Sequence, residues 1–130
     1  MRLLLDTHVA LRAITDHPGM SAKARELILA PDSTIWVSAV TVCEISIKSS
    51  LGRGRGGMPV SGKLALEHFR QAGYRLLAVE PEHAAAVEEL PGHHQDPFDR
   101  LLVAQALSEG MRLLTHDSMV ARYGDEVVCV

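Results

Sequence analysis

Short apolar runs alternate along the chain with longer segments in which apolar residues recur every three or four positions. The runs, several of them rich in β-branched or aromatic residues, predict buried strands over residues 3–5, 34–37, 75–79, 112–115 and 126–130. The periodic segments predict helices over residues 8–14, 21–30, 38–51, 61–72, 81–90, 97–109 and 116–123. This alternation indicates an α/β fold with a mainly parallel central sheet of about five short strands, flanked by helices.

The segment His-Gln-Asp-Pro-Phe-Asp-Arg at residues 94–100 begins the most apolar of these helices. Pro97 disfavours helical backbone at the residue before it, so Asp96 is predicted to be the N-cap, with proline at the first helical position. Asp99 shares a helical face with Leu102, which would carry its carboxylate into the apolar side of the helix. Asp99 either only interacts with the positive end of the helix dipole or also binds a ligand, and this segment alone leaves both alternatives open.

Two more aspartates directly follow predicted strands. Asp6 comes immediately after the first strand, and Asp117 comes just after the fourth. In an open parallel sheet, ligand sites lie outside the carboxyl ends of the strands, so both side chains are expected at the same edge. Aspartate is also a common N-cap at strand-to-helix turns, and this alternative stays open for each residue taken alone.

Glu44 lies in the middle of a predicted helix, where no capping role is available to it. It shares a stripe with Val40, Ile47 and Leu51, at spacings that place apolar side chains on one face of a helix. A carboxylate on such a face is expected to be buried, and buried charges need a partner. A salt bridge to Lys48 or to an arginine is one explanation, and a bound cation is the other.

The acids Asp6, Glu44, Asp99 and Asp117 are therefore expected to converge on one cleft. Their mutual repulsion would be costly unless a cation neutralises them. Oxygen donors without cysteine or histidine pairs suit the hard ions Mg²⁺ and Mn²⁺, which bind few protein carboxylates and keep several waters. Such ions activate water and stabilise phosphoryl oxygens, so the pattern predicts metal-assisted hydrolysis of phosphodiester bonds.

Composition limits the remaining choices. The 130 residues suit one compact domain spanning residues 1–130, and the net charge of −3 leaves nucleic-acid binding to a local basic patch. Cys43 and Cys129 have no metal or redox spacing, and we expect both to be buried thiols in a reducing compartment. No apolar run is long enough to span a bilayer, and Asp6 comes too early for a signal peptide, so we expect a cytoplasmic protein.

At these residues the chain resembles PIN-domain ribonucleases, and specifically the VapC-type toxins of bacterial toxin–antitoxin pairs. The resemblance runs through residues 3–8, 38–45, 94–106 and 115–117. The motif specific to the family is His-x-Asp-Pro-Phe-Asp-Arg followed by Leu-Leu-Val-Ala-Gln-Ala. The amino-terminal Asp-Thr is common in other proteins and does not identify the family by itself. The resemblance implies a Mg²⁺- or Mn²⁺-dependent endoribonuclease that acts on RNA, forms a homodimer and is inhibited by a VapB-type antitoxin.

Carried over by position, the acidic residues of the family fall on Asp6, Glu44, Asp99 and Asp117. The resemblance implies that Asp6 and Asp99 hold the metal, directly or through water. It also implies that Glu44 orients a water or serves as its base, and that Asp117 supports a second metal or the first. Asp96 is an extra acid of this motif, and we expect it to be the helix cap or to support the metal ligands.

Four more residues are expected near the acids. Thr7, Ser38 and Thr115 match small polar positions of the family. Arg100 either meets a phosphate or pairs with Asp96, and we prefer the pair.

The other interpretations are weaker or undecided. The segment 52–57, which contains Arg53 and Arg55, follows an RNA backbone, contacts the antitoxin or is simply solvated. A haloacid-dehalogenase-like phosphatase would need an aspartate two residues after Asp6, where the chain has His8. A receiver-like domain would need an acceptor aspartate after a middle strand, and none follows the second or the third. The open alternative is a catalytically silent PIN-like module that binds antitoxin or RNA.

Overall fold

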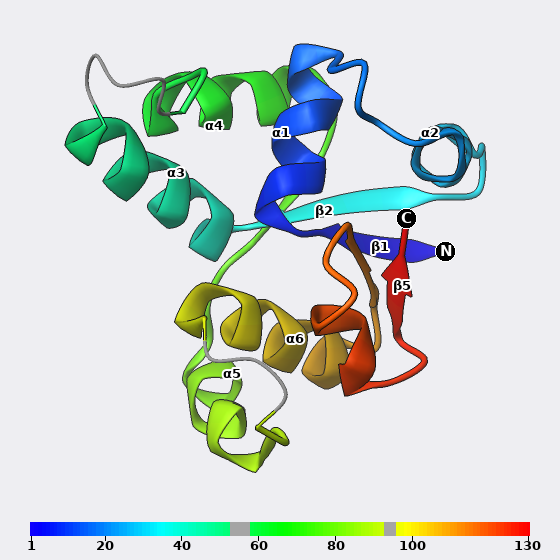
Figure 1. Cartoon of the computed structure of the whole chain (residues 1–130), viewed down its shortest axis with the longest axis vertical. Coiled ribbons are helices and arrows are strands. Elements are labelled where there is room, and N and C mark those ends of the chain that lie inside the picture. The colour runs from blue at the N-terminus through cyan, green and yellow to red at the C-terminus, as the bar shows by residue number, and fades with distance from the viewer. Residues whose placement is uncertain (53–57, 93–95) are drawn as a thin grey trace.

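A parallel sheet lies between two layers of helices in the computed structural model, which describes residues 1–52, 58–92 and 96–130 (Figure 1). The interpretations of Arg53 and Arg55 therefore lie outside the described residues. The strands are β1 (Arg2–Leu5), β2 (Thr34–Ser38), β3 (Arg75–Leu77), β4 (Arg112–Thr115) and β5 (Val127–Cys129). Their order is β3-β2-β1-β4-β5, and every neighbouring pair is parallel. The predicted α/β class is confirmed.

The helices follow the predicted order, with differences at their ends. They are α1 (Thr7–Thr15), α2 (Ala22–Leu29), α3 (Ala39–Leu51), α4 (Gly62–Gln71), α5 (Pro81–Ala86) and α6 (Pro97–Glu109), with 3₁₀ turns η1 (Val87–Glu89) and η2 (Val120–Tyr123). The helix predicted over 116–123 is wrong in its first half. There the Asp117 amide donates to the Thr115 hydroxyl, and the Asp117 carboxylate accepts from the Met119 amide. These local side-chain bonds compete with helix formation.

The central strand β1 is buried on both faces, which explains its uninterrupted apolar run. Leu3 and Leu5 pack into the core that α1, α2 and α4 cover, whereas Leu4 packs into the opposite core with α6. Helices α1 and α6 lie on opposite sides of the sheet in Figure 1. The sheet therefore fixes the start of α1 and the start of α6 at its carboxyl edge.

Two expectations about burial are wrong. Cys43 and Cys129 are both exposed, because Cys43 lines an open groove with Phe98 and Leu101 of α6 and Cys129 ends the edge strand β5. The apolar stripe of α3 does not stay buried either, since the side chains of Ile47 and Leu51 are 41% and 80% exposed. In Figure 1 the far end of α3 runs beyond the sheet, where α4 is its neighbour.

The strand order reverses direction at β1. From β1 the chain moves outward to β2 and β3 on one side, and it returns to β4 and β5 on the other. The carboxyl ends of β1 and β4 therefore flank the switch point, which is where ligands bind in open parallel sheets.

Candidate active site

Asp6 lies at this switch point, between the end of β1 and the start of α1. Its amide donates to the Leu114 carbonyl oxygen of β4 at 3.0 Å, and its Oδ1 accepts from the Val9 amide at 2.8 Å. The capping role that the sequence left open is thus present, and a carboxylate has further lone pairs with which it can accept from other partners. Burial raises the pKa of Asp6, although hydrogen bonds from the Thr115 hydroxyl and the Val9 amide oppose the shift. A nearby cation would favour its charged form.

Thr115 and Asp117 extend the same edge from β4. Thr115 is fully buried, and its hydroxyl accepts from the Asp117 amide at 3.0 Å. The carboxylate of Asp117, which is partly exposed, accepts from the Met119 amide at 2.8 Å. Both residues therefore lie at the edge where the strand ends predicted them. Thr115 connects Asp6 to the backbone of Asp117.

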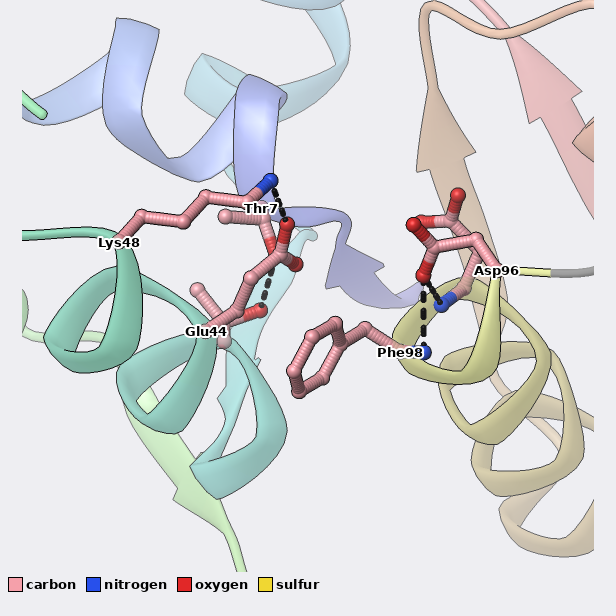
Figure 2. A network of polar contacts seen from close by, with 7 residues as sticks. Thr7, Glu44, Lys48, Asp96 and Phe98 are labelled. Carbon is pink, nitrogen blue, oxygen red and sulfur yellow. Dashed lines mark hydrogen bonds and ion pairs between the residues drawn. The ribbon is translucent and has the colours of Figure 1, made fainter. Parts of the chain in front are cut away.

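Glu44 is 3% exposed and holds contacts through both of its oxygens. Thr7 donates to Oε1 at 2.7 Å, and Lys48 contacts Oε2 at 2.6 Å (Figure 2). The Thr41 hydroxyl lies 3.2 Å from that of Thr7. The salt bridge that the sequence offered as one explanation is therefore present. Because Thr7 follows Asp6 in the chain, Glu44 is tied to the same end of β1.

Helix α6 presents two more acids toward α3. Asp96 caps α6 as predicted, since its Oδ1 accepts from the amides of Phe98 and Asp99 at 2.9 and 3.1 Å. Asp99 lies in the first turn and is partly buried. Figure 2 shows Glu44 and Asp96 on facing helices, with the ring of Phe98 between them. The site therefore draws on β1, β4, α3 and α6.

Arg100 donates hydrogen bonds to backbone carbonyl groups and does not form the predicted ion pair with Asp96. Within the described residues it donates to the carbonyl oxygens of Val87 and Pro91 at 3.1 and 3.0 Å, and to the Tyr123 hydroxyl at 3.0 Å. None of the ion pairs between described residues joins it to Asp96, so the preferred pair is wrong. Arg100 therefore binds carbonyl groups at the start of η1 and in the segment that follows it.

Ser38 lies at the start of α3, but its side chain serves a polar network that the sequence did not reveal. Its hydroxyl accepts from the Val40 amide at 3.0 Å and donates to Gln105 Oε1 at 2.6 Å. Gln105 Nε2 donates to the Ala78 carbonyl at 3.2 Å and lies 3.4 Å from His83 Nδ1. The available signal was a single glutamine inside an apolar helical run. This network fixes the end of α3 that leads to Glu44.

The acids converge only partly. Among the described residues, no three aspartate, glutamate, histidine or cysteine side chains are placed to enclose one metal ion. Mg²⁺ commonly takes only one or two protein carboxylates and keeps its other ligands as water. Two buried carboxylates, Asp6 and Glu44, at the switch point suit that mode of binding. The donor set therefore fits a hydrated divalent ion better than a closed cage.

Comparisons with known proteins agree with this architecture. The family model of the PIN domain matches residues 3–126. Ribonuclease VapC22 of Mycobacterium tuberculosis is 32% identical over 118 residues, which cover 88% of this chain and 86% of that protein.

Solved structures share the fold at lower identity. VapBC2 from Rickettsia felis, bound to a DNA fragment from its promoter, has a TM-score of 0.71 at 18% identity, covering 100% of this chain and 98% of that one. FitAcB from Neisseria gonorrhoeae has a TM-score of 0.65 at 20% identity, with coverage of 98% and 96%. VapC20 from M. tuberculosis, a sarcin-ricin loop cleaving toxin, has a TM-score of 0.62 at 14% identity, with coverage of 94% and 95%. The chain therefore belongs to the PIN-domain family, among its VapC-type members.

Proposed function

We propose that this chain is a divalent-metal-dependent endoribonuclease that hydrolyses RNA phosphodiester bonds. The observation that carries the proposal is the pair of buried carboxylates, Asp6 and Glu44, at the switch point of a PIN-family sheet. Neither carboxylate contributes to an apolar core, and both lie at the edge where ligands bind. Asp6 also caps α1 and Glu44 also pairs with Lys48, but two buried carboxylates at the ligand-binding edge of one sheet support a functional site beyond those structural roles.

Asp6 and Asp99 would hold the Mg²⁺ or Mn²⁺ ion, directly or through water. When bound, the ion would supply positive charge that stabilises phosphoryl oxygens and makes water a stronger nucleophile. Glu44, whose carboxylate Thr7 holds in a fixed orientation, would complete the acidic pocket around the ion and would orient a water bound to it or accept the proton of that water. Asp117 would support the ion from the end of β4, and Asp96 would fix the first turn that carries Asp99.

The relatives support a role as the toxin of a toxin–antitoxin pair. Ribonuclease VapC22 is a relative with 32% identity, and VapBC2 is among the structures that share the fold. We therefore propose RNA as the substrate, a VapB-type protein as the inhibitor and a homodimer as the assembly. In the described part of the chain, no helix has the length and apolar character that crossing a bilayer requires. We propose the cytoplasm as the site of action, since RNA is found there.

Cleavage of RNA by the purified chain tests the proposal. Total cellular RNA is incubated with wild type, Asp99→Asn and the matched control Ser108→Ala, whose side chain is exposed on the same helix. The proposal predicts discrete products with Mg²⁺ or Mn²⁺ for wild type and control. It predicts no products with EDTA or with Asp99→Asn. Equal products from Asp99→Asn would remove that residue from the site, and absence of cleavage in every condition would favour a silent binding module.

A further inference from the structure

Lys48 reaches the candidate site from the solvent side of α3. Its Nζ lies 2.6 Å from Glu44 Oε2, one helical turn away, and the side chain of Lys48 is 46% exposed while that of Glu44 is 4% exposed. Figure 2 shows the lysine chain extended over the glutamate toward Thr7. The contact therefore joins a solvent-reachable ammonium group to a carboxylate that has almost no access to water.

The charges around Lys48 come from two helices. The hydrogen bond with Glu44 raises the pKa of Lys48, and the charges of Glu44, Asp96 and Asp99 act in the same direction against partial desolvation. Lys48 is thus a persistent cation within electrostatic reach of acids on α3 and on α6. An ordinary exposed pair of this spacing links two solvated groups and contributes little. Here one partner is buried, and leaving it unpaired would be costly.

We infer that Lys48 is the built-in counter-cation of this site, and that its ammonium group and a divalent ion compete for Glu44. The inference rests on the proposed function, because it needs a divalent ion to approach Glu44. Oε1 accepts from Thr7 and Oε2 contacts Lys48, so an ion that binds this carboxylate shares an oxygen with one of the two. A divalent cation also repels the ammonium group, which makes Lys48 the group that leaves.

Competition has two measurable consequences. Removing the lysine should strengthen binding of a divalent ion, since the ion no longer has to displace an ammonium group. It should also destabilise the metal-free protein, since Glu44 would then be buried without its cation. The destabilisation should vanish when a divalent ion takes over the neutralising role.

Calorimetric titration of the full chain with MnCl₂ tests the inference in wild type, Lys48→Met and the matched control Lys63→Met. Lys63 is an exposed lysine on α4, so its loss changes the net charge equally. We expect Lys48→Met to bind Mn²⁺ about three- to ten-fold more tightly than wild type. Lys63→Met and Lys48→Arg should stay within about two-fold of wild type, because they leave the cation at Glu44 in place.

Thermal unfolding is the second measurement, and it shows whether a variant has lost stability as well as metal affinity. Thermal midpoints are measured in EDTA and in saturating Mn²⁺, and the midpoint of Lys48→Met should fall only in EDTA. In a Glu44→Gln background, Lys48→Met should change neither the midpoint nor the affinity, because no buried charge needs neutralising.

The outcomes separate the two proposals. Unchanged or weaker Mn²⁺ affinity in Lys48→Met, with wild type binding normally, would overturn the competition and leave the nuclease proposal standing. A midpoint that falls equally in EDTA and in Mn²⁺ would show an ordinary structural salt bridge and overturn it as well. Absence of Mn²⁺ binding by wild type would remove the metal site itself, and both proposals would fail together.

Discussion

The glutamine in α6 offers a sharp test of how the fold positions the site. Gln105 is fully buried, accepts from Ser38 at 2.6 Å and donates to the Ala78 carbonyl at 3.2 Å. Gln105→Met keeps the length of the side chain and removes both hydrogen bonds. Stranding the buried Ser38 hydroxyl costs about 1–3 kcal/mol, and losing the bond to the more accessible Ala78 carbonyl costs about 1 kcal/mol. We therefore expect the free energy of unfolding to fall by about 2–4 kcal/mol.

Urea denaturation followed by circular dichroism measures this loss in wild type, Gln105→Met, Ser38→Ala and the double variant. Ser38→Ala removes the cap of α3, which costs about 1 kcal/mol, but it also removes the hydroxyl that Gln105→Met would strand. The double variant should therefore lose at least about 1 kcal/mol less than the sum of the single losses. Leu107→Met, at an exposed position of α6, is the control and should change stability by less than about 0.5 kcal/mol. A loss below about 0.5 kcal/mol for Gln105→Met, or additive losses, would refute the reasoning.

Further predictions concern the acids and the contact between α3 and α4. Asp99→Asn should slow RNA cleavage by about 100-fold or more, whereas Asp96→Asn should lose less activity because asparagine still caps α6. Initial cleavage rates measure both losses, and a larger loss for Asp96→Asn would mean that the two aspartates have the opposite roles. Burial raises the pKa of Asp6, so the metal-free protein should lose stability as the pH rises from 3.8 through that raised value. Asp6→Asn should not show this pH-dependent loss of stability. Thermal midpoints measured in EDTA that fall equally with pH in wild type and Asp6→Asn would contradict the prediction. Gly62→Ala should cost about 1–3 kcal/mol, because a Cβ there would lie 1.7 Å from Ser46 Oγ and 2.8 Å from its Cβ. Ser46→Gly should restore most of that loss, and denaturant midpoints without such recovery would exclude close helix packing as the cause.

The fold was predictable because its elements carry local signals. Leu3 to Leu5 form a continuous apolar run since both faces of β1 are covered. Asp96 and Pro97 mark the start of α6 through backbone geometry alone, and the structure has the predicted cap. Such signals depend on near neighbours in sequence, so they can be read without knowing the tertiary contacts.

The predictions that were wrong or missing concern residues whose surroundings are set by contacts distant in sequence. Nothing near Gln105 in sequence identifies Ser38 as its partner, 67 residues away. Leu51 shares the periodicity of a buried face, yet the end of α3 extends past the sheet and leaves it exposed. Arg100 was expected to meet an acid, but carbonyl groups of a preceding turn take its donors. Periodicity identifies which face of a helix is apolar, whereas the length of the neighbouring sheet decides how much of that face is covered.

The central claim is that acids at the carboxyl edge of β1 and at the start of α6 hold a divalent ion. Anomalous diffraction from a crystal soaked in MnCl₂ tests it most directly. The account predicts one Mn²⁺ peak near the carboxylates of Asp6, Glu44 and Asp99, with Mn–O distances of about 2.0–2.2 Å or a bridging water. The Lys48 ammonium group should then have moved away from Glu44. A peak bound elsewhere, or none in a well-diffracting soaked crystal, would contradict the account.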